Sequence, residues 1–282
     1  MENAIELRGL RKHYKQFTLD GVSLTLPLGC IMGFIGENGA GKSTTIKAML
    51  GLIQPDGGEI RLLGKDPAAD RSVMEEVGMV LDSGFFPPEM NAQKLGKSLA
   101  GMYRHWDSTA YAHYLQRFDI HPGKKVKELS RGMVMKLSLA VALSHGARLL
   151  LLDEATSGLD PVVRDDILDI LYDFIQDERH SVFLSSHITA DLEKIADYIT
   201  FIHQGKVLMS GEKDTLLETY GLYHCTQEQL SELEPNAVVG YRKSDFGVTA
   251  LVKRYRMPGG FPVESATLDD IMLYSIKGKM AL

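Results

Sequence analysis

One glycine-rich stretch restricts the fold of this chain more than any other part of the sequence. Residues 36–44 read Gly-Glu-Asn-Gly-Ala-Gly-Lys-Ser-Thr, after an apolar run at 31–35 and before a helical pattern at 45–50. Strand, glycine loop and helix with the spacing Gly-x-x-x-x-Gly-Lys-Ser form the P-loop pattern in its required context. A glycine turn that merely caps a helix does not need Lys and Ser at these positions. The stretch therefore predicts an α/β domain that binds phosphate groups.

Each residue type in this loop has a physical role. The glycines allow the backbone to curl, so that successive N–H groups point at one phosphate chain at the positive end of a helix. Lys42 is expected to reach the β- and γ-phosphates of ATP, and the Ser43 hydroxyl to ligate Mg²⁺. The predicted nucleotide-binding residues of the loop are Gly36, Asn38, Gly39, Ala40, Gly41, Lys42, Ser43 and Thr44.

The composition limits the class of protein. The 282 residues are 44% hydrophobic and 24% charged, which is ordinary for a soluble globular chain. The net charge of −6 gives no electrostatic case for binding nucleic acid. Cys30 and Cys225 predict free thiols in a reducing compartment rather than a disulfide framework. The first residues do not resemble a signal peptide, and no apolar run approaches the ~20 residues that span a bilayer. We therefore expect a cytoplasmic protein that contacts the membrane only through a partner.

The remaining patterns predict an α/β fold with four parts. Alternating segments near the start and after the P-loop helix favour an antiparallel β subdomain. Buried-strand runs separated by helices favour a parallel sheet for the P-loop core. Residues of about 83–143 have helical spacing and predict an inserted α-helical subdomain. We divide the chain into an ATP-binding domain at 1–220 and a small β-rich appendage at 221–282, which ends in a helix.

A second acidic motif follows a run of four leucines at 149–152. An acidic residue at the end of a buried strand beside a P-loop is placed to hold Mg²⁺ through water, which is the role we expect of Asp153. Glu154 is then placed to polarise the attacking water as general base. For these two residues alone, capping of a helix N-terminus remains an equal alternative.

Taken together, the motifs resemble those of ATP-binding cassette (ABC) ATPases, the nucleotide-binding subunits of transporters. The resemblance covers roughly residues 3–220, and the motifs occur in the order of that family. The sequence Leu-Ser-Arg-Gly-Met at 129–133 separates this family from other P-loop enzymes. The matching segments are 36–44, 129–133, 149–154, Ser-Gly-Leu-Asp at 157–160, and His187.

The family resemblance implies that the complete site needs two copies of the chain. Ser130 and Gly132 start a predicted helix at 134–143 and thus form a second anion-binding helix N-terminus. The resemblance implies a head-to-tail homodimer around two ATP, in which Ser130 of one copy completes the site of the other. Asp160 is similar to the residue that bridges the two sites.

The resemblance also assigns two aromatic residues. His187 resembles the switch histidine that contacts the γ-phosphate, although a lone histidine at a helix start is usually structural. Tyr14 resembles the aromatic residue that stacks on adenine, and its alternative is a tyrosine packed at a strand edge.

Three positions depart from the family pattern. Asp82 stands where the family usually has glutamine, and we expect its carboxylate to approach Mg²⁺ through water. Arg131 and Met133 replace residues of the Leu-Ser-Gly-Gly-Gln motif, while Ser130 and Gly132 retain the backbone anion site. Phe85 and Phe86 follow Asp82 and could plug the core of the domain. In this family, however, the region receives a helix of the membrane subunit, so we favour a role as docking anchors.

The function implied by the resemblance is that of an exporter ATPase. The motif forms look like those of bacterial ABC-2 type exporters of drugs, antibiotics or peptides. We expect a peripheral protein on the inner face of the cell membrane, held there by a separate transmembrane permease subunit. An importer ATPase and a soluble non-transport ABC ATPase are the alternatives. The short C-terminal element argues against the importer, and the acidic charge with a single cassette argues against the soluble class.

Overall fold

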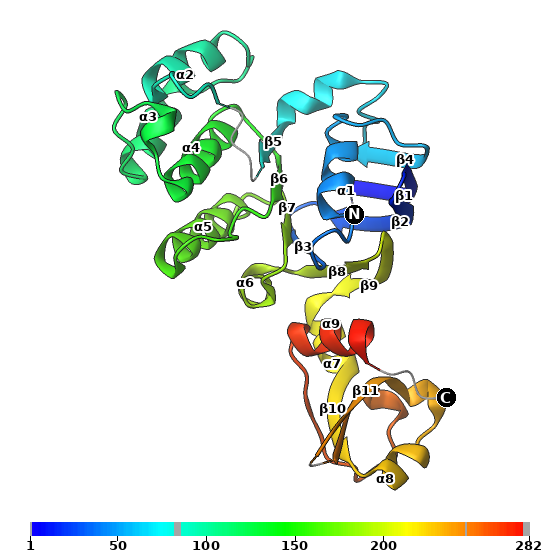
Figure 1. Cartoon of the computed structure of the whole chain (residues 1–282). Coiled ribbons are helices and arrows are strands. Elements are labelled where there is room, and N and C mark those ends of the chain that lie inside the picture. Colours follow the sequence, from blue (N-terminus) through cyan, green and yellow to red (C-terminus); the bar gives the residue numbers. More distant parts are fainter. Residues whose placement is uncertain (1, 82–85, 246, 279–282) are drawn as a thin grey trace.

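The computed structural model describes residues 2–81, 86–245 and 247–278, and its core is a six-stranded sheet (Figure 1). The strand order is β5-β6-β7-β3-β8-β9, in which only the β8–β9 pair is antiparallel. The strands are β3 (Ile31–Ile35), β5 (Val77–Val80), β6 (Leu149–Asp153), β7 (Ser181–Ser186), β8 (Tyr198–His203) and β9 (Lys206–Glu212).

The four leucines of β6 show why this sheet is buried on both faces. Leu150 and Leu152 belong to the hydrophobic cluster that contains the helices of the insertion. Leu149 and Leu151 belong to a second cluster with the first strands of the chain. Because side chains alternate across a strand, a continuous apolar run fits a strand with a core on each side.

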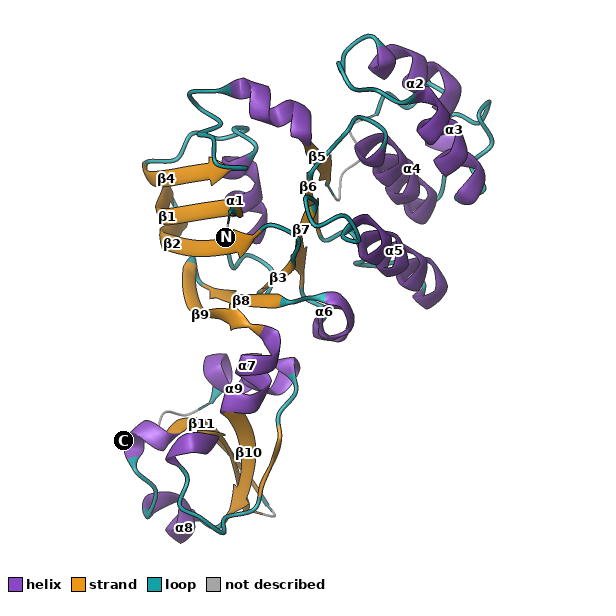
Figure 2. Ribbon diagram, turned by 180° about the vertical axis from the view of Figure 1, so that it is seen from behind, coloured by secondary structure: helices purple, strands orange, loops and turns teal. Residues whose placement is uncertain are grey.

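The second cluster lies between the central sheet and a three-stranded antiparallel sheet of order β2-β1-β4. Helix α1 (Lys42–Met49) lies between the two sheets, as both views show (Figure 2). The predicted antiparallel subdomain is therefore confirmed. Its strands are β1 (Asn3–Tyr14), β2 (Phe17–Pro27) and β4 (Gly57–Leu62).

Helices cover the other face of the central sheet, and the predicted helical insertion is confirmed. Helix α4 begins at Arg131, earlier than the predicted 134–143, because the Ser130 side chain caps it. Asp160 caps α5 in the same way, ahead of Pro161. The helices are α2 (Ala92–Ala100), α3 (Ser108–Arg117), α4 (Arg131–Leu143), α5 (Pro161–Phe174) and α6 (Thr189–Ile195).

The C-terminal part forms a four-stranded sheet of order β11-β12-β10-β13. Its last helix packs back on the first part: Leu268 N donates to Glu193 Oε1 at 2.6 Å, and Ile271 shares a cluster with the ATPase core. The division at residue 220 stays a prediction. The elements are α7 (Lys213–Thr219), β10 (Tyr220–Cys225), α8 (Gln227–Ser231), β11 (Val238–Ser244), β12 (Gly247–Lys253), β13 (Val263–Ser265) and α9 (Leu268–Lys277).

Short 3-10 helices occupy Arg71–Glu76, Val126–Glu128, Pro235–Ala237 and Arg254–Arg256. Within the described ranges, none of the helices combines the length and the apolar character that a bilayer crossing requires. Both cysteines, Cys30 and Cys225, are free.

Candidate functional site

The glycine loop excludes a side chain at two of its positions, Gly41 and Gly36. Gly41 has a φ of 118°, and a Cβ atom there would lie 2.9 Å from Cδ1 of Leu19. A Cβ atom on Gly36 would lie 2.5 Å from the carbonyl oxygen of Ile202. The sequence therefore places glycine where the fold has no room for a side chain, and α1 starts directly after this turn.

Lys42 points back into the loop instead of into solvent. Its Nζ donates to the carbonyl oxygens of Gly36 at 2.6 Å and Glu37 at 3.2 Å. The same Nζ lies 3.0 Å from Oε1 of Glu154. The side chain is only 5% exposed, so these oxygens compensate the charge of a buried ammonium group.

Ser185 of the neighbouring strand β7 fixes Asp153 and Glu154. Its Oγ donates to Asp153 Oδ1 at 2.7 Å. The backbone N of Glu154 donates to the carbonyl oxygen and to the Oγ of Ser185, each at 3.1 Å. Glu154 has a φ of 54°, in the left-handed region that non-glycine residues rarely adopt. The strand thus ends in a strained turn directly at the acidic pair, as is common for residues of functional sites.

His187 completes a line of three contacting side chains. Its Nδ1 lies 2.6 Å from Oε2 of Glu154, whose Oε1 faces Lys42. Oε1 of Glu154 is buried, and its contact with Lys42 is an ion pair without the geometry of a hydrogen bond. This oxygen can therefore still accept a hydrogen bond. The structure therefore brings together the phosphate-binding lysine, the general base and the switch histidine that the sequence analysis expects, although these motifs lie far apart in the chain.

Ser130, Gly132 and Asp160 lie together at a second place. They line a cavity of about 250 Å³ to which no residue of the glycine loop contributes. Ser130 Oγ accepts from Met133 N at 3.3 Å, and Asp160 Oδ1 accepts from Val163 N at 3.0 Å. Helix α4 lies on the far side of the central sheet from α1 in both views (Figures 1 and 2). Within one chain, these residues are not part of the site around Lys42.

Tyr14 is linked to the glycine loop through a second aromatic residue. It is 46% exposed, and its ring lies 6.5 Å from that of Phe17. A Cβ atom on Gly41 would lie 3.0 Å from Cζ of Phe17, so Phe17 packs against the loop. Lys12 Nζ lies 5.9 Å from the centre of the Tyr14 ring. The exposed ring is thus available for stacking next to the loop.

Known proteins resemble this chain in both sequence and fold. Residues 19–157 match the model of the ABC transporter family. The bacitracin transport ATP-binding protein BcrA of Bacillus licheniformis is 32% identical over 74% of this chain and 69% of its own. The lantibiotic transport ATP-binding protein SrtF of Streptococcus pyogenes is 32% identical over 74% of this chain and 91% of its own.

The chain belongs to the ABC transporter family. A solved ATP-binding cassette, described as a dimer in a post-hydrolysis state bound to ADP and Pi, superposes with a TM-score of 0.66 at 21% identity. This match covers 74% of the present chain and 98% of the cassette, and it shows the shared fold. The ABC ATPase resemblance and the α/β fold class expected from the motifs are confirmed.

The remaining predicted nucleotide-binding residues of this ABC chain differ in how exposed they are. Ser43 and Thr44 are half-buried in the first turn of α1, and Asn38 is exposed. Ala40 O accepts from Gly205 N at 2.9 Å, which ties the loop to the β8–β9 turn. Asp82 and Phe85 lie outside the described residues. Within the described ranges, no cluster of three or more His, Cys, Asp or Glu side chains is placed to hold a metal ion.

Two residues of this ABC site, Ser185 and His203, were not predicted from the sequence. Ser185 holds both members of the acidic pair, and the serines before His187 were its available signal. His203 Nδ1 lies 2.8 Å from Oε1 of Glu37 at the end of β8, and no local pattern pointed to this pair. Both depend on contacts between separate strands.

Proposed function

We propose that this ABC family member is the ATP-binding and ATP-hydrolysing subunit of a membrane exporter. It drives export of a drug, antibiotic or peptide through a separate transmembrane permease subunit. The observation that carries the proposal is that Glu154 contacts both Lys42 of the glycine loop and His187. The relatives named for bacitracin and lantibiotic transport support an exporter over an importer or a soluble ABC ATPase.

The glycine loop holds the triphosphate of ATP. Its exposed turn around Gly39, where a Cβ atom would meet nothing within 4 Å, leaves space for phosphate oxygens beside the backbone N–H groups. Lys42 exchanges its carbonyl contacts for the β- and γ-phosphates, which are stronger partners for an ammonium group. Tyr14 stacks on the adenine ring.

Ser43 and Asp153 fit a magnesium ion carried by the nucleotide. Both offer oxygen ligands, and one carboxylate oxygen of Asp153 is fixed by Ser185, which orients the group. Asp82 was assigned to the same ion and stays a prediction. When bound, Mg²⁺ neutralises charge on the phosphate oxygens.

Glu154 acts as general base for the attacking water. Oε1 of Glu154 is free to accept a hydrogen bond from the water. His187 contacts Oε2, so the carboxylate keeps one orientation. The water loses its proton to Glu154 as its oxygen attacks the γ-phosphorus, and ADP leaves with the bridging oxygen. A positioned general base contributes about 10²–10⁴ to the rate.

Two copies share each ATP. Ser130 and Gly132 present the N-terminus of the 13-residue helix α4 to a cavity that contains no glycine-loop residue of the same chain. In a head-to-tail homodimer this end meets the γ-phosphate held by the second copy, and Asp160 lies at the boundary. The dimeric cassette with the same fold supports this arrangement.

The permease docks on another cavity of about 340 Å³, which lies between the ATPase core and the helical insertion. Phe86 and Leu99 line it and are half-buried, while Met79 and Met102, which also line it, are 43% and 77% exposed. Exposed apolar side chains at a cavity suit a partner helix. This contact would hold the subunit on the cytoplasmic face of the membrane, and nucleic acid has no role in the proposal.

Complementation between two inactive variants tests the shared site. Lys42→Ala removes the phosphate cation, and Ser130→Arg blocks the α4 end; each variant alone should lose ATPase activity. In a 1:1 mixture, half of the dimers are mixed and each has one intact site, so we expect about a quarter of the wild-type rate. No recovery on mixing, with both variants folded and dimeric, would contradict the head-to-tail arrangement.

A further inference from the structure

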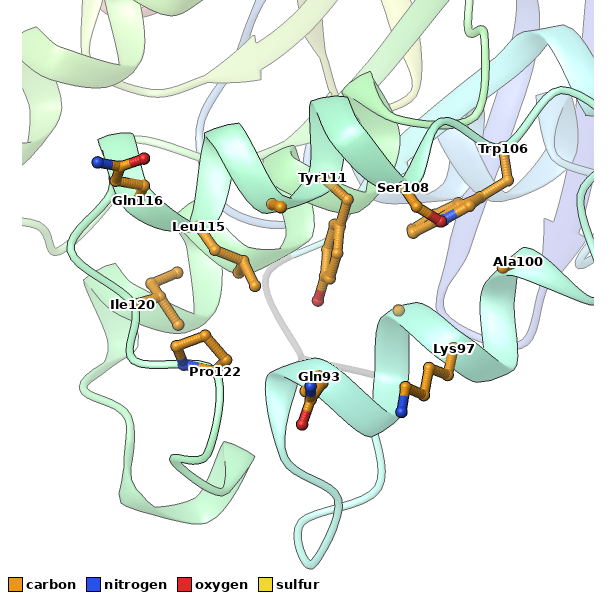
Figure 3. A pocket seen from close by; sticks show the side chains of 12 residues that line it. Gln93, Lys97, Ala100, Trp106, Ser108, Tyr111, Leu115, Gln116, Ile120 and Pro122 are labelled. Atoms are coloured by element: carbon orange, nitrogen blue, oxygen red, sulfur yellow. The ribbon is translucent and has the colours of Figure 1, made fainter.

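The helical insertion contains a separate cavity that plays no part in the proposed ATPase cycle. It has a volume of about 570 Å³ and lies between α2 and α3. The lining includes Gln93 and Lys97 of α2 and Tyr111 and Leu115 of α3, and Figure 3 shows these residues with Trp106 at one end. This volume lies within the range of small-molecule sites, which are mostly apolar with a few polar groups.

The aromatic wall of this cavity is held in place. Tyr111 is buried, and its hydroxyl donates to the carbonyl oxygen of Ala92 at 2.9 Å. Trp106 Nε1 donates to Ser108 Oγ at 3.2 Å, and the indole lies 5.1 Å from the Tyr111 ring. A Cβ atom on Gly96 would lie 2.4 Å from the Tyr111 ring, so the glycine in mid-helix makes room for it. A ligand would therefore meet a preformed surface.

The charge of the cavity lining selects one kind of ligand. Lys97 is the one charged side chain among the residues that line it, and no acidic residue lines it. Across the described ranges, no ion pair to Lys97 is formed. Gln93 and Gln116 add amide groups at the rim. The lining combines an apolar body with a single positive charge.

We propose that this cavity binds an amphiphilic organic anion, a molecule with a ring or short hydrocarbon body and one acidic group. The body lies against Trp106, Tyr111 and Leu115, and the acidic group pairs with Lys97. Helix α2 also lines the cavity proposed for the permease, through Leu95 and Leu99 on its other face. A bound anion therefore contacts the same helix that lines the permease cavity. This last consequence alone rests on the proposed function.

Two fluorescent probes with nearly the same body test the assignment on the full chain. 8-Anilinonaphthalene-1-sulfonate carries an anionic group, and N-phenyl-1-naphthylamine lacks it. Trp106 is the single tryptophan of the protein, so its emission reports a ligand in this cavity. We expect the sulfonate to quench Trp106 saturably and to bind more tightly than the neutral probe. Equal affinity of the two probes would overturn the proposal.

Lys97→Gln separates charge pairing from apolar binding. It should weaken the sulfonate about fivefold, as expected for one exposed ion pair, and leave the neutral probe unchanged. Lys94→Gln is the matched control, because Lys94 is an exposed lysine of the same helix that does not line the cavity. The Lys94→Gln variant should bind the sulfonate as tightly as the wild type does. If Lys97→Gln also binds the sulfonate with unchanged affinity, the proposal is overturned. If that variant instead weakens co-purification with the permease, the cavity is a protein interface.

Discussion

Oε1 of Glu154 lies 3.0 Å from Nζ of Lys42, so the general base and the phosphate-binding cation of the proposed cycle contact each other directly. Both side chains are largely buried, with 15% and 5% exposed. A phosphate that attracts Lys42 removes the cation from Glu154. The carboxylate is then free to accept a proton from the attacking water. Nucleotide binding and activation of the base are thereby coupled through one ion pair.

Glu154→Gln should retain ATP binding and lose hydrolysis. The amide keeps the size of the side chain but cannot take a proton, so we expect the rate to fall by about 10²–10⁴. Unhydrolysed ATP should then hold two copies together, and size-exclusion chromatography in the presence of ATP should detect a dimer. Turnover at the wild-type rate would show that Glu154 is not the base.

Lys42→Ala should weaken the binding of nucleotide itself. Loss of a charge-assisted contact to phosphate lowers affinity by about tenfold or more, measurable by titration with a fluorescent ATP analogue. Lys47→Ala is the control, since Lys47 is an exposed basic residue of the same helix. If both variants bind the analogue equally well, the role of the glycine loop must be revised.

Ser185→Ala should reduce both stability and ATPase activity. It leaves Asp153 Oδ1 without its donor, at a cost of about 1–3 kcal/mol in the free energy of unfolding. Ser181→Ala is the matched control at the other end of β7, where the buried Ser181 Oγ accepts from Gly29 N. We expect the two variants to lose similar stability in urea unfolding, and only Ser185→Ala to lose activity at saturating ATP. Equal activities would mean that Ser185 has only a structural role.

His145 should make the protein less stable at acidic pH. Burial lowers the pKa of His145, whose Nδ1 contacts Glu75 O at 3.2 Å and whose ring stacks on Tyr103. The unfolded chain takes up a proton near the ordinary pKa of about 6.5, before the folded protein does. Stability is therefore lost as pH falls below that value, by at most about 1.4 kcal/mol per pH unit from this group.

The His145→Asn variant keeps a donor for Glu75 O but does not titrate. Its thermal midpoint should fall less than that of the wild type between pH 7 and pH 5. Parallel curves for the two proteins would assign the acid sensitivity to other groups.

Local sequence determined the chemical groups of this protein and the type of element that carries each one. The loop at 36–44 has its glycines where a strand turns into a helix, and Asp153 follows a run of residues that only a doubly covered strand accommodates. Both signals arise from neighbouring residues, because turn geometry and strand burial act over a few positions. The predicted start of α4 at residue 134 was wrong by one turn, because the capping side chain of Ser130 starts the helix at Arg131.

Only the tertiary structure decided which of these groups meet. The parallel register pairs Asp153 with Ser185 and Ile35 with Ser186, and this pairing brings the acidic pair, His187 and the glycine loop to one edge of the sheet. The contact of Glu154 with Lys42 and the separation of Ser130 from both follow from the order of strands. Strand order depends on burying apolar faces that lie far apart in the chain, so no local pattern encodes it.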